Sequence, residues 1–201
     1  VDAVEADREH PAGGEVNIDF AHPPQLTGIE AYEAVFGFRQ RMYIEKKRFS
    51  VTANLAMTRK LHSRVGPFGG IDIAEDLDWG RRADALGHRT RYAPAMRVLH
   101  PARADFAAVQ RKWQQLVRHD WNAHLASGRP ALAWRLRALA LMLSIPVEGI
   151  RILASRRLSG LANRWRGIVV LARARRFRAG EMRRVMTAPA ESGGDFWNSA
   201  A

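Results

Sequence analysis

Residues 64–101 constrain the fold most, because glycines, prolines and acidic residues divide this stretch into a turn, a helix and strands. Acidic side chains gather at the start of residues 75–86, where they suit a helix dipole, and Gly87 is well placed to end that helix. Residues 90–92 and 96–99 favour two short strands separated by a turn. The glycines of the preceding turn are Gly66, Gly69 and Gly70. We therefore expect an α/β fold with a mixed sheet and covering helices.

A strand and a helix are expected before this stretch. Residues 15–20 alternate apolar and polar side chains, which is typical of a half-buried strand. Thr27 followed by Glu30 has the pattern of a capping box, so we predict a helix over residues 28–47. The side chains of this helix that are expected to face the core are Ile29, Tyr32, Phe36 and Tyr43. An extended segment at residues 49–57 and a short helix at residues 58–65 lead into the glycine turn.

The second half of the chain is predicted to be helical. Asp105 is expected to cap a long helix that ends near residue 126. Residues 131–154 are apolar on most sides, but their cleanest apolar run, residues 138–147, is far shorter than the ~20 residues that span a bilayer. An arginine-rich amphipathic segment follows, with Leu161, Trp165, Ile168, Val169 and Ala172 on its apolar face. We expect three parts: a body (1–127), a basic helical extension (128–187) and a disordered tail (188–201).

Charge is distributed unevenly along the chain. The formal net charge is +12, and residues 1–100 carry 14 basic and 14 acidic side chains, whereas residues 101–201 carry 18 and 6. This asymmetry predicts a balanced catalytic or binding body with a basic extension for a polyanion, either a membrane surface or a nucleic acid. A hydrophobic content of 47% excludes a wholly disordered chain, and the absence of cysteine excludes disulfides and thiolate metal sites.

Glu75 and Asp76 are the strongest candidates for chemistry. Adjacent residues of a helix face different ways, so one carboxylate can point into a cleft while the other binds backbone amides at the helix start. A carboxylate in a cleft can act as a general base toward a hydroxyl, or bind a hard cation. The glycine turn can bring backbone N–H groups close to a phosphate or sugar, and His100 at a strand end can complete a metal site. The alternative is that both acids only cap the helix.

Two segments of the chain resemble a known enzyme family. TANLAMTRKLHSRVGPF, followed by AEDLDWGRRADALGHRTRYAPAMRVLHPAR, closely resembles the second half of the catalytic domain of family 2 glycosyltransferases, which have the GT-A fold. The likeness covers about residues 16–118. It keeps the family's order of a T-A-N segment, a glycine loop, an E-D helix start, a G-h-x-h-x-Y-x-P strand and a V-x-H ending. The resemblance implies part of a GT-A mixed sheet, followed by a helical C-terminal extension.

The resemblance also implies an inverting transfer of a sugar from a nucleotide-sugar donor to an acceptor hydroxyl. Asp76 would be the general base, and Glu75 the neighbouring acid that contacts the acceptor or the backbone. His100 would help to hold a divalent metal, Mg²⁺ or Mn²⁺, at the diphosphate. The residues that would border donor and acceptor are Thr52, Asn54, Gly66, Gly69 and Gly70. Polysaccharide, lipid and protein acceptors all stay open.

The chain departs from the family in one respect. No D-x-D pattern occurs before residue 16, and the nucleotide-binding half that carries it in the family is not in this sequence. We interpret the chain as a fragment of a longer enzyme; the alternatives are an inactive remnant and a non-catalytic basic protein that binds membrane or nucleic acid. No helix-turn-helix, zinc-finger or RNP pattern supports nucleic acid. We expect a cytoplasmic protein held peripherally at the inner face of an anionic membrane by its basic extension.

Some other side chains have two interpretations. Trp134 and Trp165 lie among arginines and apolar residues, which fits an interfacial helix on anionic lipid, but packing on the body is the alternative. Trp79 is expected in the core or in a cleft wall. Asp78 is expected to pair with one of the two arginines that follow it.

Overall fold

Three strands form a small mixed sheet in the computed structural model of the chain, whose described residues are 9–21, 23–69 and 74–187. The strands are β1 (Ala12–Asp19), β2 (Leu55–Ala56) and β3 (Arg91–Pro101), in the order β2-β1-β3. β1 is antiparallel to β2 and parallel to β3. The prediction of an α/β fold with a mixed sheet is thereby confirmed for the described residues.

β3 is a single strand where the sequence predicted two. Its pairing with β1 shifts register between Gly13, which faces Tyr92, and Glu15, which faces Arg97. Pro94 lies in the part of β3 that this shift leaves out of the ladder. Because proline has no N–H to donate, such an unpaired position suits it. The proline that was expected to separate two strands therefore marks an irregularity inside one.

The side chain of Asn54 forms hydrogen bonds with both β1 and β3 at this shift of register. It is buried, and its Nδ2 donates hydrogen bonds to the carbonyl oxygens of Glu15 at 2.8 Å and Met96 at 3.2 Å. Residue 14 is a glycine because a Cβ there would lie 2.2 Å from the Met96 carbonyl oxygen. Asn54 ends the 3₁₀ helix η2 (Thr52–Asn54), which leads directly into β2. Its amide thus supplies donors that the interrupted ladder lacks.

The predicted helix over residues 28–47 is divided into α2 (Gly28–Phe36), α3 (Gln40–Met42) and a π-helix, η1 (Tyr43–Lys47). The capping box is confirmed: the Thr27 hydroxyl accepts from the Glu30 N–H at 3.2 Å, and the Glu30 carboxylate accepts from the Thr27 N–H at 2.7 Å. The helix breaks because Gly37 is a poor helix former and Arg39 adopts φ −130° and ψ 51°, outside the helical region. The prediction of one continuous helix is wrong, although its start is right.

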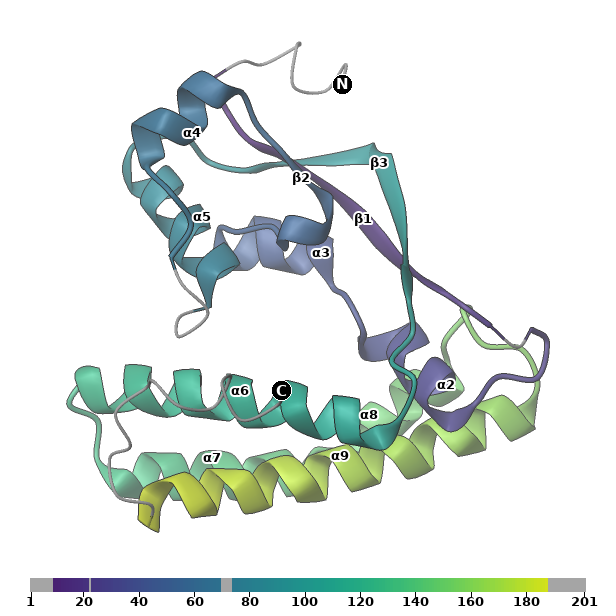
Figure 1. Ribbon diagram of the computed structural model, residues 1–201. Coiled ribbons are helices and arrows are strands. Elements are labelled where there is room, and N and C mark those ends of the chain that lie inside the picture. The colour runs from purple at the N-terminus through teal and green to yellow at the C-terminus, as the bar shows by residue number, and fades with distance from the viewer. Residues whose placement is uncertain (1–8, 22, 70–73, 188–201) are drawn as a thin grey trace, which may run out of the picture.

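The remaining helices are α4 (Arg59–Val65), α5 (Glu75–Ala85), α6 (Phe106–Ala126), α7 (Ala131–Leu143), α8 (Ile145–Leu153) and α9 (Leu161–Thr187). α4 and α5 lie beside the sheet, whereas α6 to α9 form a layer on the other side of the molecule, with α2 at the junction (Figure 1). α6 begins as predicted, since Asp105 accepts a hydrogen bond from the Ala108 N–H at 2.7 Å. No helix of the described residues combines the length and apolarity needed to cross a bilayer.

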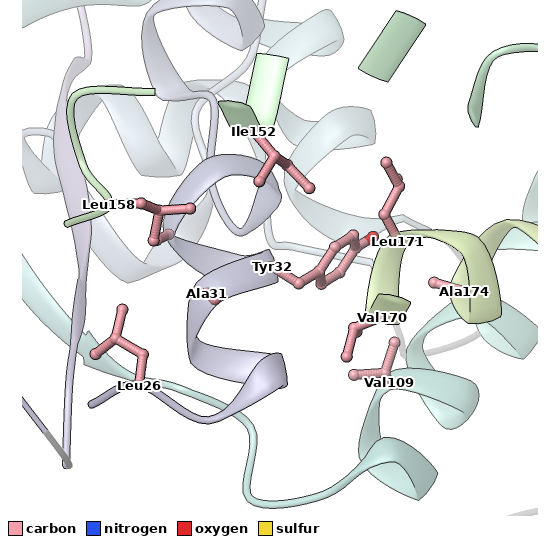
Figure 2. Close-up of a cluster of buried hydrophobic side chains, with 10 residues drawn as sticks. Leu26, Ala31, Tyr32, Val109, Ile152, Leu158, Val170, Leu171 and Ala174 are labelled. Atoms are coloured by element: carbon pink, nitrogen blue, oxygen red, sulfur yellow. The ribbon is translucent and has the colours of Figure 1, made fainter. Parts of the chain in front are cut away.

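One hydrophobic cluster joins the helical layer to α2 and the chain before it, and a second, smaller cluster lies within that layer. The larger consists of Leu26, Ala31, Tyr32, Ala34, Val109, Ile152, Leu158, Val170, Leu171 and Ala174. Figure 2 shows Tyr32 reaching from α2 toward Leu171 of α9. The smaller consists of Val117, Trp134, Ala138 and Met182. Both clusters contain residues from each side of the predicted boundary between 127 and 128, so the basic extension packs on the body. The predicted tail, 188–201, lies outside the described residues.

The two tryptophans of the extension have opposite environments. Trp134 is buried, and its Nε1–H donates to the carbonyl oxygen of Met182 at 2.7 Å. Trp165 is 66% exposed and Leu161, on the same predicted apolar face of α9, is 80% exposed. The opposite face of α9 is the one that enters the larger cluster. Packing on the body therefore explains Trp134 but leaves the predicted apolar face of α9 largely uncovered.

We predict that Asn54→Ala lowers the free energy of unfolding by about 1–3 kcal/mol, because two buried carbonyl groups lose their donor. Chemical denaturation measures this change. Thr52→Ala, an exposed neighbour in the same turn, is the matched control and is expected to change little. Equal stability of the two variants would contradict the structural role of Asn54.

Candidate functional site

The candidate site is built around the start of α5, which packs tightly against the chain before η2. A Cβ on Gly80 would come within 2.5 Å of the Cβ of Phe49, so only glycine permits this approach. The neighbouring Trp79 is fully buried and stacks on Phe68 with 5.2 Å between ring centroids. Its Nε1–H donates to the carbonyl oxygen of Gly66 at 2.9 Å. Trp79 is therefore a core residue, one of the two predicted alternatives, and it anchors the glycine turn.

Arg82, one helical turn after Trp79 in α5, binds the same glycine turn. Its guanidinium donates to the carbonyl oxygens of Val65 and Pro67, both at 2.7 Å. Its Nε–H donates to the Asp78 carboxylate at 2.9 Å, which confirms the predicted pairing of Asp78. Side chains of α5 thus hold three consecutive carbonyls at the end of α4. Sequence reasoning missed this role of Arg82, because the spacing to Asp78 predicts the ion pair but not the bonds to the turn.

Asp76 is half-buried in the first turn of α5. Its Oδ1 accepts a hydrogen bond from the Leu77 N–H at 2.8 Å, which satisfies one of the free amides at the helix start. Burial is the main cause that raises the pKa of the Asp76 carboxyl, and the charge of Glu75 raises it further. The Leu77 amide and the charge of His119 act in the opposite direction. A carboxylate with a raised pKa is a stronger base than an ordinary aspartate.

Tyr43 is an electrostatic neighbour of Asp76 that the sequence did not reveal. Burial raises the pKa of its phenol; the charge of Arg39 lowers it, and the charge of Asp76 raises it. The ring stacks on Phe49, with 5.2 Å between centroids and 16° between planes. Tyr43 reaches this position because η1 turns away from the line of α2. The charge of Asp76 thus acts on Tyr43 of η1, and the charge of His119 of α6 acts on Asp76.

The other predicted site residues are dispersed. Gly66, with a φ of 91°, ends α4 and belongs to the unit bound by Trp79. Thr52 is exposed in η2, whereas Asn54 is buried and has its amide nitrogen bound to the sheet. Glu75 is half-buried beside Asp76. Gly69 lies in the loop between α4 and α5, and Gly70 is outside the described residues.

His100 does not join Asp76 in the structure. Its ring lies against Phe38, with 5.0 Å between centroids, and its Nδ1 is 2.8 Å from the Pro101 carbonyl oxygen. Figure 1 shows the end of β3 beside α2, whereas α5 lies near the start of that strand. Among the described residues no group of three His, Asp or Glu side chains could hold a metal ion. The structure does not bring His100 to Asp76, and the divalent ion that the resemblance implies at His100 stays a prediction.

Comparison with known proteins adds no family assignment. No protein-family model, no curated protein and no solved structure matches this chain. The similarity to family 2 glycosyltransferases accordingly depends on the motifs around residues 52–100 alone and stays a prediction.

The environment of Asp76 predicts a pH-dependent stability. Because the pKa of this acid is raised on folding, its contribution to stability is present below its unfolded pKa and is lost as pH rises through the folded value. We therefore expect Asp76→Asn, which carries no charge, to be more stable than the natural chain at neutral pH. The difference should shrink as the pH falls toward 4 and Asp76 takes up its proton. Chemical denaturation at several pH values measures this, and an advantage that persists unchanged at low pH would contradict the burial of a charged Asp76.

Proposed function

We propose that this chain carries the catalytic base of an inverting glycosyltransferase, and that the base is Asp76. The observation that carries the proposal is the half-buried Asp76 carboxylate, with a raised pKa, on a helix bound firmly to a glycine turn. The Leu77 amide donates to Oδ1 and so orients the carboxylate, and we assign Oδ2 as the atom that takes the proton of the substrate hydroxyl. The motif resemblance supports the same residue.

The proposed reaction is a single displacement. The acceptor hydroxyl transfers its proton to Asp76 Oδ2 while its oxygen bonds to the anomeric carbon of the donor. The bond from that carbon to the diphosphate breaks, the nucleoside diphosphate leaves with the electron pair, and the anomeric configuration inverts. Backbone N–H groups of the glycine turn would approach the donor, and Glu75 would bind the acceptor or the backbone. None of the described residues is given a metal-binding role in this mechanism.

The proposal predicts that Asp76→Asn slows sugar transfer by about 100-fold or more, the usual effect of removing a general base. The assay is release of nucleoside diphosphate from a panel of nucleotide sugars, with the full chain. Asp84→Asn, the same charge change near the other end of α5, is the control and should leave the rate unchanged. Turnover of Asp76→Asn at the natural rate would refute the base. Failure of the natural chain to bind any nucleotide sugar would favour an inactive remnant.

A second proposal concerns the membrane, and a specific surface of the helical layer favours it. Seven large apolar side chains of α7 and α8 are 51–67% exposed: Leu132, Leu136, Leu139, Leu143, Val147, Ile150 and Leu153. Their spacing of three or four residues places them on one face. Only Ser144 separates the two helices. Its φ of −76° and ψ of −9° lie in the right-handed helical region, so the exposed face continues from α7 into α8. We call this face the α7–α8 stripe.

The α7–α8 stripe points away from the rest of the helical layer. Trp134 and Ala138 of α7, and Ile152 of α8, are the residues that face the buried clusters. An exposed apolar surface of this length is unusual for a surface helix without a partner. The helices are too short and too interrupted to span a bilayer, so we propose that they lie on its surface.

Charge supports an anionic lipid surface as the partner of the stripe. The stripe belongs to the half of the chain with 18 basic and 6 acidic residues, and exposed Arg135 and Arg151 flank it. Pairing of two copies through this face would bring like charges together, whereas anionic lipid neutralises them. A nucleic acid would satisfy the charge but would leave the leucines in water. An anionic lipid surface accounts for both the basic charge and the exposed leucines.

We expect the double variant Leu136→Gln/Leu139→Gln to bind phosphatidylglycerol vesicles about tenfold more weakly or worse, because two leucines no longer enter the acyl boundary. Co-sedimentation with vesicles measures this. Leu86→Gln/Leu99→Gln, which changes two exposed leucines elsewhere, is the matched control. Unchanged vesicle binding together with loss of a dimer would assign the stripe to a second copy. Salt-sensitive DNA binding without preference for anionic vesicles would favour the nucleic-acid alternative.

A further inference from the structure

A cavity of about 530 Å³ lies at the junction of the two layers. One side is formed by the segment from Phe38 to Lys46, which includes α3 and most of η1, and the other by the end of α8 and the residues that follow it. β1 and α2 supply Val16 and Val35 to its wall. Its volume is within the range of small-molecule sites, about 300–1,000 Å³. Asp76 does not line it, so this cavity is separate from the candidate base.

Positive charge dominates the lining of this cavity. Its basic residues are Arg39, Arg41, Lys46, Arg151, Arg156 and Arg157, against two acidic residues, Glu15 and Glu45. Glu45 is already bound to Arg41 at 2.8 Å, and Glu15 shares a hydrogen bond with Tyr92. Six basic side chains against these two carboxylates leave the lining with a net positive charge. A concave surface with charge of one sign concentrates the field inside it and attracts an anion.

The arginines of the cavity differ in how many contacts their guanidinium groups make within the protein. Arg151 is oriented by Glu148 at 2.9 Å and by the ring of Phe36, 5.6 Å from its guanidinium carbon. Arg157 donates to the carbonyl oxygen of Ala34 at 3.2 Å, so it is held by one nitrogen. Arg39 and Arg156 are exposed and make no ion pair with the described residues. Like charges gathered in this way repel one another, and a bound anion would remove that repulsion.

We infer that this cavity binds a phosphate or diphosphate group, held by Arg39 and Arg156 from opposite sides. Guanidinium groups bind phosphate oxygens through paired N–H donors, which makes arginine the residue suited to this anion. The apolar part of the lining, with Val16, Val35, Phe38 and Met42, would accommodate an organic group attached to the phosphate. The ligand is therefore a phosphate ester, either a soluble one or a lipid headgroup.

The test uses the full chain and two probes. Inorganic pyrophosphate, followed by isothermal titration calorimetry, represents the soluble source. Vesicles with phosphatidic acid, compared with phosphatidylcholine alone, represent the lipid source. The cavity variant is Arg39→Gln/Arg156→Gln. The control is Arg111→Gln/Arg183→Gln, which removes the same charge from two exposed arginines outside the cavity.

We expect the cavity variant to bind at least one probe about tenfold more weakly or worse than the natural chain, because two charge-assisted contacts are lost. The control should stay within about twofold of the natural chain, since distant surface charges are screened. An effect on pyrophosphate assigns a soluble ester, and an effect on phosphatidic acid alone assigns a headgroup. Binding of neither probe by the natural chain, or an equal loss in the control, would overturn the inference. Asp76→Asn should bind the probe normally, which separates this site from the proposed base.

Discussion

The hydrogen bonds from Trp79 and Arg82 to the carbonyls of residues 65–67 are the constraint on which the candidate site depends. These carbonyls occur where α4 ends, so they have no partner within that helix. α5 supplies the donors, and in doing so it fixes the position of its own first turn relative to the glycine turn. A general base is effective only when it is held within hydrogen-bond reach of the proton it removes. The position of Asp76 therefore follows from two side chains that themselves take no part in the chemistry.

The helical layer is held together by a different set of contacts, which centre on α9. α9 is covered on one face by α2, α6, α7 and α8, and this packing accounts for the buried side chains of the basic extension. Arginines of α9 also contribute to that packing: the guanidinium carbon of Arg178 lies 4.4 Å from the ring centroid of Trp113, and Arg166 donates to the carbonyl oxygen of Leu26 at 3.0 Å. Adjacent residues of α8 belong to different surfaces: Ile150 to the α7–α8 stripe and Arg151 to the basic cavity. The apolar and the anionic parts of a single amphiphilic ligand could thus be recognised within one helix.

Local features of the fold were predictable from the sequence, and features between distant segments were not. The caps predicted at Thr27 and Asp105 each depend on residues within three positions, and both are present. The parallel pairing of β1 with β3 joins residues as far apart as Val16 and Val98, and Asn54 donates to carbonyl groups 39 and 42 positions away; no local pattern specifies either. For the same reason, the sequence suggested Asn54 as a substrate contact, when its amide is bound to the sheet.

The amphipathic helices show a related limit. Periodicity grouped Leu161, Trp165 and Val169 on one face of α9, but it did not tell whether that face is covered. The structure buries the opposite face, through smaller residues such as Ala174. At the site, the motif identified Asp76 and the glycine turn together. It also placed His100 with them, although His100 lies at the end of β3, with its ring against Phe38. Motif order along the chain does not guarantee proximity in space.

The pH profile of sugar transfer by the full chain tests the central claim most directly. If Asp76 is the base, kcat/KM falls on the acid side with a single protonation, and its apparent pKa lies above the 3.8 of an ordinary aspartate. Transfer that is independent of pH through the acid range, in a chain that stays folded there, would contradict the account.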